Sequence, residues 1–138
     1  MRVYFLDRLL GWESLTRTVE QVYAALPPTQ RAQACVLTSN YGEAGALSQL
    51  AAPGRLPPVI SGHNNYYLWG PGRCTGQVLI GVGYALADFR HTYIHTTLAA
   101  THRCRYCVSF EQDLPIVVAS NPTSSDPLRQ WPALKSYD

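Results

Sequence analysis

The sequence is poor in charge and has no long apolar run. Only 14% of its 138 residues are charged, and 11 basic against 9 acidic residues leave a net charge of +2 without a cluster of either sign. Nucleic acids and anionic lipids are bound by clustered positive charge, so neither is expected as a partner. The longest uncharged apolar stretch, 77–87, is far shorter than the roughly 18 residues of a membrane-spanning helix. Asp7 interrupts the apolar start, so we expect no secretory signal.

Motifs of the common enzyme classes are missing as well. The loop that follows residues 34–38 has neither a G-x-G-x-x-G pattern nor a Walker lysine for nucleotides, and the chain has no G-x-S-x-G elbow and no H-E-x-x-H zinc motif. None of the 9 acids stands at a spacing typical of paired acid–base carboxylates. We therefore expect no catalytic residue and no cofactor in this chain.

The chain does contain enough apolar sequence for one folded domain. Hydrophobic residues make up 46% of it, which excludes disorder for most of its length, and its size suits a single core. We expect one domain over 1–138, with a linker-like lead-in at 1–12 and a C-terminal tail with a short helix at 121–138.

The spacing of apolar residues predicts alternating helices and strands. Leu15, Val19, Val22 and Leu26 recur at helical spacing, which predicts a helix over 13–26 that ends at Pro27. A second helix is predicted between Asn40 and Pro53, a helical turn at 84–89, and strands at 34–38, 56–61, 77–83, 91–99 and 114–120. Because residues 34–61 resemble a parallel crossover unit, we expect a three-layer, Rossmann-like α/β domain with a mainly parallel sheet.

Two polar loops follow the first two predicted strands. Ligands of α/β proteins bind where strands end and helices begin, so both loops are candidates for binding or docking. The alternatives are a capping box in the first loop and a crossover pinned by its aromatic rings in the second. If the two strands are neighbours, both loops open on one edge of the sheet. The candidate residues are Asn40, Tyr41, Glu43, His63, Asn64, Asn65, Tyr66 and Trp69.

The cysteines leave the cellular compartment open. Cys104 and Cys107 form a C-x-x-C with His102 just before it, which assembles three residues of the types that bind zinc. A disulfide in an oxidising compartment explains the same cysteines, and a structural zinc site normally has two such clusters, so we favour no metal. Residues considered as a fourth zinc ligand are Cys74, His91 and His95, and the remaining cysteine is Cys35.

Six segments, taken in order, resemble the soluble C-terminal domain of bacterial integral-membrane glycosyltransferases. This family is related to protein O-mannosyltransferases and to the aminoarabinose lipid A transferases. The paired motifs NYGEAGA and SGHNNY..WGP are the most specific part of the resemblance. The segments are GWESLTRTVEQVYAALPP, LTSNYGEAGAL, LPPVISGHNNYYLWGPG, VLIGVG, DLPIVVAS and LRQWPALKSYD.

The resemblance implies a place for the chain on the extracytoplasmic side of a membrane, after a bundle of transmembrane helices. Enzymes of this family pass a sugar from a polyprenyl-phosphate donor to a protein or lipid acceptor. The implied partners are therefore the transmembrane half of the enzyme and the polyprenyl-phosphate sugar or its acceptor. The family's catalytic acid lies in the membrane half, so no catalytic residue is carried over. Two alternatives stay open: a free-standing α/β binding or interaction module, and a small α/β enzyme.

Overall fold

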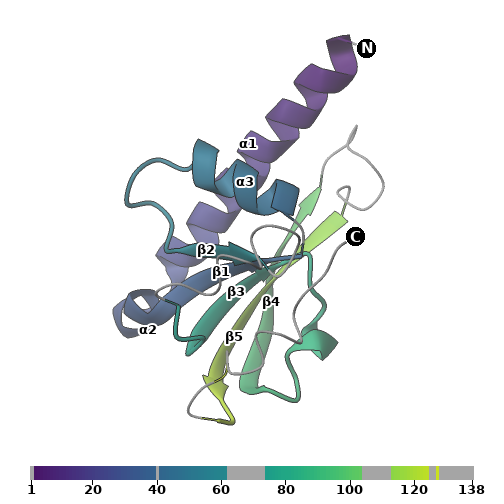
Figure 1. The fold of residues 1–138 in the computed structure, drawn as a ribbon. Helices are drawn as coiled ribbons and strands as arrows, with labels where there is room; N and C mark the ends of the chain where they lie inside the picture. Colours follow the sequence, from purple (N-terminus) through teal and green to yellow (C-terminus); the bar gives the residue numbers. More distant parts are fainter. Residues whose placement is uncertain (1, 40, 62–73, 104–112, 125–126, 128–138) are drawn as a thin grey trace.

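The computed structural model describes residues 2–39, 41–61, 74–103, 113–124 and 127, with only the backbone described at 2–10 and 41–44. Within these residues the chain forms one five-stranded sheet, and helices α1 and α3 lie on the same side of it (Figure 1). The predicted α/β class is thus confirmed.

The first helix is longer than the spacing of apolar residues predicts. Helix α1 (Arg2–Ala25) begins at Arg2, so the expected lead-in at 1–12 is helical from its second residue. Leu15 and Val19, one turn apart, are almost fully buried against the sheet. The short helix α2 (Pro28–Gln33) was not predicted. Its proline, Pro28, stands at the first helical position, where a backbone N–H would make no hydrogen bond within the helix, so the lack of one costs nothing.

The predicted parallel crossover is confirmed. Strand β1 (Ala34–Thr38) leads into helix α3 (Tyr41–Leu50) and then into strand β2 (Val59–Ser61), which pairs parallel with β1. All of β1 is buried, as expected of a parallel strand covered on both faces.

The second half of the sheet differs from the expected one. Strand β3 (Val78–Val82) pairs parallel with β1, and the 3-10 turn η1 (Leu86–Asp88) leads to strand β4 (Tyr93–Arg103). Strand β5 (Asp113–Pro122) lies antiparallel between β3 and β4, which gives the order β2-β1-β3-β5-β4. A parallel connection needs about a dozen residues or more, so the short segment 104–112 favours the antiparallel pair. The sheet is therefore parallel at one edge and antiparallel at the other.

Two buried clusters cover the two faces of the sheet. On the helical face, α1 and α3 pack on apolar side chains of β1, β3 and β5. On the opposite face, the connection between β3 and β4 supplies the cover, and within the described residues no α-helix contributes to that cluster. The described residues thus provide the sheet and one helical layer. The second cluster contains Cys35, Leu37, Ile60, Cys74, Leu79, Phe89, Tyr93, Val117 and Ala119, with Tyr84 and Leu86 packed against it.

Three rings, which we call the aromatic cap, lie on this second face: Tyr84, Phe89 and Tyr93. Successive rings meet edge to face, with centroids 5.4 Å apart for Tyr84 and Phe89 and 6.0 Å for Phe89 and Tyr93. Beneath them, a Cβ built on Gly81 would lie 2.7 Å from ring atoms of Phe89. Because Gly81 has no side chain, the Phe89 ring can lie directly against the sheet.

Candidate functional site

The carboxyl ends of the three parallel strands meet at one edge of the sheet. Thr38, the last residue of β1, pairs with Ser61 of β2 on one side and with Val82 of β3 on the other. The Ser39 N–H donates a hydrogen bond of 3.1 Å to the Val82 carbonyl, which fixes the start of the first polar loop to β3. We call this edge the carboxyl edge. The condition that the strands preceding both loops are neighbours is confirmed.

Two small hydroxyl side chains lie beneath this edge. Thr38 and Ser61 are both fully buried, and the Thr38 Oγ1 donates to the Ile60 carbonyl at 3.5 Å. Buried hydroxyls are stable only when they are hydrogen-bonded, so these two side chains serve the ends of the strands and do not offer a free nucleophile.

The first predicted loop residues fall at the start of α3. Tyr41 and Glu43 lie in the first turn of this helix, which starts close to the end of β1, and Asn40 is outside the described residues. A helix amino terminus carries a partial positive charge and unpaired N–H groups, both of which favour an anion. Leu47, one turn further along α3 than Glu43, is fully buried and anchors the helix to the sheet.

The second predicted loop lies beyond the described residues. Ser61 is the last residue described before it, and Cys74 is the first after it. The predictions for these loop residues therefore stay predictions, although the strand that leads into the loop is placed at the carboxyl edge. The residues concerned are His63, Asn64, Asn65, Tyr66 and Trp69.

One residue at this edge was missed by the sequence analysis. The Tyr84 hydroxyl donates a hydrogen bond of 3.2 Å to the Thr38 carbonyl, and its ring belongs to the aromatic cap. The sequence did contain a signal, because Tyr84 directly follows the predicted strand 77–83, as Ser39 directly follows the predicted strand 34–38. Tyr84 thus joins the carboxyl edge to the core of the second face.

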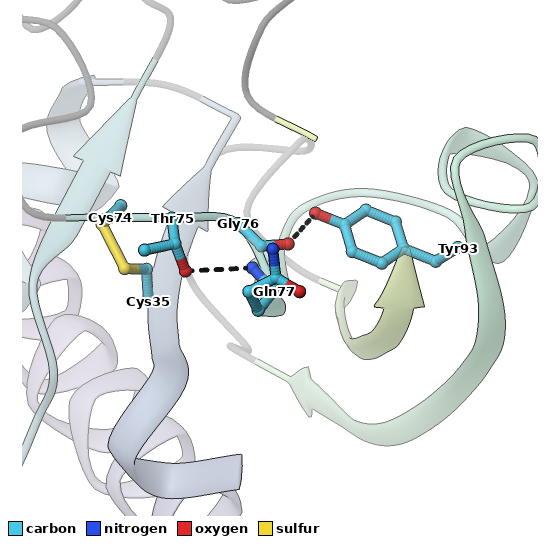
Figure 2. The surroundings of a disulfide bond; sticks show 6 residues. All are labelled: Cys35, Cys74, Thr75, Gly76, Gln77 and Tyr93. Carbon is cyan, nitrogen blue, oxygen red and sulfur yellow. Dashed lines mark hydrogen bonds between the residues drawn. A yellow bond between two sulfur atoms is a disulfide. The ribbon is translucent and has the colours of Figure 1, made fainter. Parts of the chain in front are cut away.

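A disulfide joins the other ends of the same strands. Cys35, the second residue of β1, is bonded to Cys74, which precedes β3, and the two Cα atoms are 5.9 Å apart (Figure 2). Both cysteines are buried. The bond closes a covalent loop across a sequence separation of 39, and this loop contains β1, α3 and β2 together with both predicted polar loops.

The segment after Cys74 is fixed by two further hydrogen bonds. The Gln77 N–H donates to the Thr75 hydroxyl at 3.3 Å, and the Tyr93 hydroxyl donates to the Gly76 carbonyl (Figure 2). Burial raises the pKa of Tyr93 well above its ordinary value, so the hydroxyl keeps its proton and remains a donor. Through Tyr93 the disulfide segment is connected to the aromatic cap.

The possible zinc ligands are not brought together among the described residues. Cys74 is used by the disulfide and is therefore not a fourth ligand. His91 is exposed, and the His95 Nδ1 is 2.8 Å from the side-chain nitrogen of Asn121. In the part of the chain that the structure describes, no group of three His, Cys, Asp or Glu side chains is arranged to hold a metal. Cys104 and Cys107 lie outside that part.

His102 is buried in β4 and has no hydrogen-bond partner among the described residues. Only 5% of its surface is exposed, and neither ring nitrogen is bonded. Burial lowers the pKa of the imidazole below its ordinary value, so the ring is neutral. Val82 and Ala100 both pair with Ile116, which places His102 two residues beyond their level, at the carboxyl edge but on the far side of β5.

Comparison with models of protein families, with curated proteins and with solved structures gave no match. Among the described residues, none of the helices combines the length and the apolar character that a membrane span requires.

Proposed function

We propose that this chain is an extracytoplasmic, non-catalytic domain of a membrane glycosyltransferase that uses a polyprenyl-phosphate sugar. Its role is to position the donor or the acceptor near the membrane surface. The observation that carries the proposal is the pairing of Thr38 with Ser61. This pairing brings Ser39, which directly precedes NYGEAGA, and Ser61, the first residue of SGHNNY..WGP, to the same edge of the sheet. These are the two most specific segments of the resemblance.

The chemistry of the carboxyl edge suits a substrate that contains a sugar and a phosphate. The amino terminus of α3 offers backbone N–H groups to a phosphate oxygen. The amides and aromatic rings predicted for the second loop are the groups that bind sugar hydroxyls and stack on sugar rings. No residue of this edge is assigned a catalytic role, and the proposal needs no cofactor. A three-layer, Rossmann-like arrangement remains part of the hypothesis.

The disulfide supports the extracytoplasmic location. Disulfides persist in oxidising compartments and are rare in the cytosol, where thiols are kept reduced. The bond between Cys35 and Cys74 is buried within the core of the second face, so it belongs to the folded structure and not to an exposed redox site.

Titration with sugar phosphates and with a short polyprenyl-phosphate analogue, followed by amide NMR, tests the proposal. We expect shifts at Ser39 and Ser61 and in the loops that follow them, because these residues lead into the proposed binding surface. Shifts confined to the opposite end of the parallel strands, at Ala34, Thr75 and Gln77, would contradict it. Absence of any shift with either ligand would do the same.

A second function is favoured by the shape of α1. The amino end of this helix extends beyond the sheet (Figure 1), which suits a domain that docks on the membrane half without touching substrate. The double variant Asn64→Ala/Asn65→Ala in a full-length enzyme separates the two functions. A raised KM with normal assembly indicates substrate contact, whereas impaired assembly with an unchanged KM indicates docking.

A further inference from the structure

The outer side of β4 is free within the described residues. This strand pairs with β5 alone and forms one edge of the sheet. Ile94 and Leu98 on it are 67% and 50% exposed, which is unusual for large apolar side chains in a structured strand. From Ile94 to Thr101 the strand carries neither a formal charge nor a proline.

The opposite edge of the sheet is protected in a way that β4 is not. Strand β2 has only three residues and follows Pro57 and Pro58 directly. Natural proteins shield sheet edges with short strands, prolines and charges, because a free edge pairs readily with another strand. By these criteria β2 is closed to pairing, and the eleven residues of β4 are open to it.

The regular part of β4 ends at a bulge. From Tyr93 to Leu98 the register against β5 is unbroken, and it then shifts between Leu98 and Ala100. A bulge twists the strand and ends regular pairing on its outer side. The segment that is free to accept a new strand is therefore 93–98.

This segment is complementary to itself. If two copies pair antiparallel with Thr96 opposite Thr96 of the other copy, Ile94 of each copy lies opposite Leu98 of the other. These three residues alternate along the strand, so they share one face, and both exposed apolar side chains become buried in cross-strand pairs. No formally charged side chain lies within 93–98 to oppose its own copy.

The other face of the strand offers a second apolar surface. A groove runs between the carboxyl-terminal half of α1 and the last two strands, lined by Val22 of α1, by Leu26 directly after it, and by Ala99, Ala100 and Val118 of the sheet. Ala99 and Ala100 lie at and just beyond the bulge, so the groove offers apolar atoms to the end of a strand added at 93–98.

We propose that β4 is a homodimer interface, at which residues 93–98 of two copies pair antiparallel around Thr96 and join the two sheets into one. The symmetry is closed, because each β4 uses its only free edge, and the assembly stops at two copies. This proposal is independent of the carboxyl edge and of the proposed function.

Analytical ultracentrifugation of the full chain at concentrations up to about 1 mM, where even weak edge pairing is populated, tests the dimer. We expect a concentration-dependent dimer for the natural sequence and a monomer for Ile94→Lys/Leu98→Lys, because this variant places lysines opposite one another. Leu50→Lys is the matched control, since Leu50 is 37% exposed but lies on α3. A monomer at all concentrations overturns the proposal, as does a dimer that survives the double substitution or an open-ended polymer.

A cysteine placed at the proposed axis tests the register. Under mild oxidation Thr96→Cys should form a covalent dimer, because the two sulfur atoms face each other across the axis. Ser14→Cys on the exposed side of α1 serves as the control and should remain uncrosslinked, like the natural sequence. Equal crosslinking of both variants, or of neither, overturns the register.

Discussion

The two halves of the sheet are built on different principles. In the parallel half, β1 and β3 are buried along their whole length, and the disulfide joins the start of β1 to the segment that leads into β3. In the antiparallel half, β4 has most of its residues exposed or partly exposed, and no other described strand pairs with its outer edge. Parallel strands require cover on both faces, whereas an antiparallel strand tolerates solvent on one face. The difference agrees with the two proposals above, in which the parallel half supports the candidate site and the antiparallel half associates.

Removal of the disulfide is the largest expected perturbation of the parallel half. The double variant Cys35→Ala/Cys74→Ala should lose about 4 kcal/mol of unfolding free energy, because a loop of this length gains about that much chain entropy when it is opened. Urea unfolding measures the loss. A reducing agent should give the natural protein the same midpoint as the variant.

The matched control for this variant is Gln33→Ala, an exposed substitution two residues before Cys35. It should change the unfolding free energy by less than about 0.5 kcal/mol. An equally small effect of the double variant would mean that the bond does not hold the parallel half together.

Truncation of one isoleucine in each half compares the two halves directly. Ile80 of β3 is completely buried, and Ile94 of β4 is 67% exposed. Ile80→Ala should cost about 3 kcal/mol, since it leaves a cavity in the core. Ile94→Ala should cost less than about 0.5 kcal/mol in the monomer. Thermal unfolding at low protein concentration measures both, and similar losses would remove the distinction between the halves.

Substitution of Gly81, at the centre of the sheet where the two halves join, should cause an intermediate loss of unfolding free energy. The Gly81→Ala variant places a methyl group 2.7 Å from the ring of Phe89. Displacing that ring should cost about 2 kcal/mol, a typical penalty for overpacking. A second substitution, Phe89→Leu, relieves the contact, so the double variant should be more stable than the sum of the two single losses predicts. Additive losses would show that the ring does not press on Gly81.

The parallel half could be predicted from the sequence, and the reasons are local. Residues 34–38 are a short apolar run that stops at a polar loop, and Leu47 lies on the apolar side of the helix that follows. A strand, a helix and a second strand in this order have few alternatives to a parallel crossover. Whether the two strands are neighbours was left as a condition, and the pairing of Thr38 with Ser61 fulfils it.

The rest could not be predicted, because it depends on contacts between distant residues. Strand β5 lies between β3 and β4, although it follows both in the chain. The pairing of Cys35 with Cys74 is one of three connectivities that four cysteines allow, and nothing in their spacing selects it. The amino-terminal part of α1 lacks the spacing of residues 15–26, so its helical start at Arg2 was missed.

Substitution of His102, in the antiparallel half, gives the smallest expected change in unfolding free energy. The sign of that change tells whether the buried ring stabilises the fold. The pKa of this buried ring is lowered, so folding favours the neutral form. The stability that comes from this preference for the neutral ring is fully present above the pKa of 6.5 in the unfolded chain. It is lost as the pH falls from 6.5 to the lower pKa of the folded protein. His102→Leu should remove this pH dependence and, at pH near 7, raise the unfolding free energy by about 1 kcal/mol, because neither ring nitrogen is hydrogen-bonded to another described residue. His91→Leu, at an exposed position, is the control. Urea unfolding across this pH range measures both variants, and a loss of stability in His102→Leu at neutral pH would show that the ring makes a stabilising bond after all.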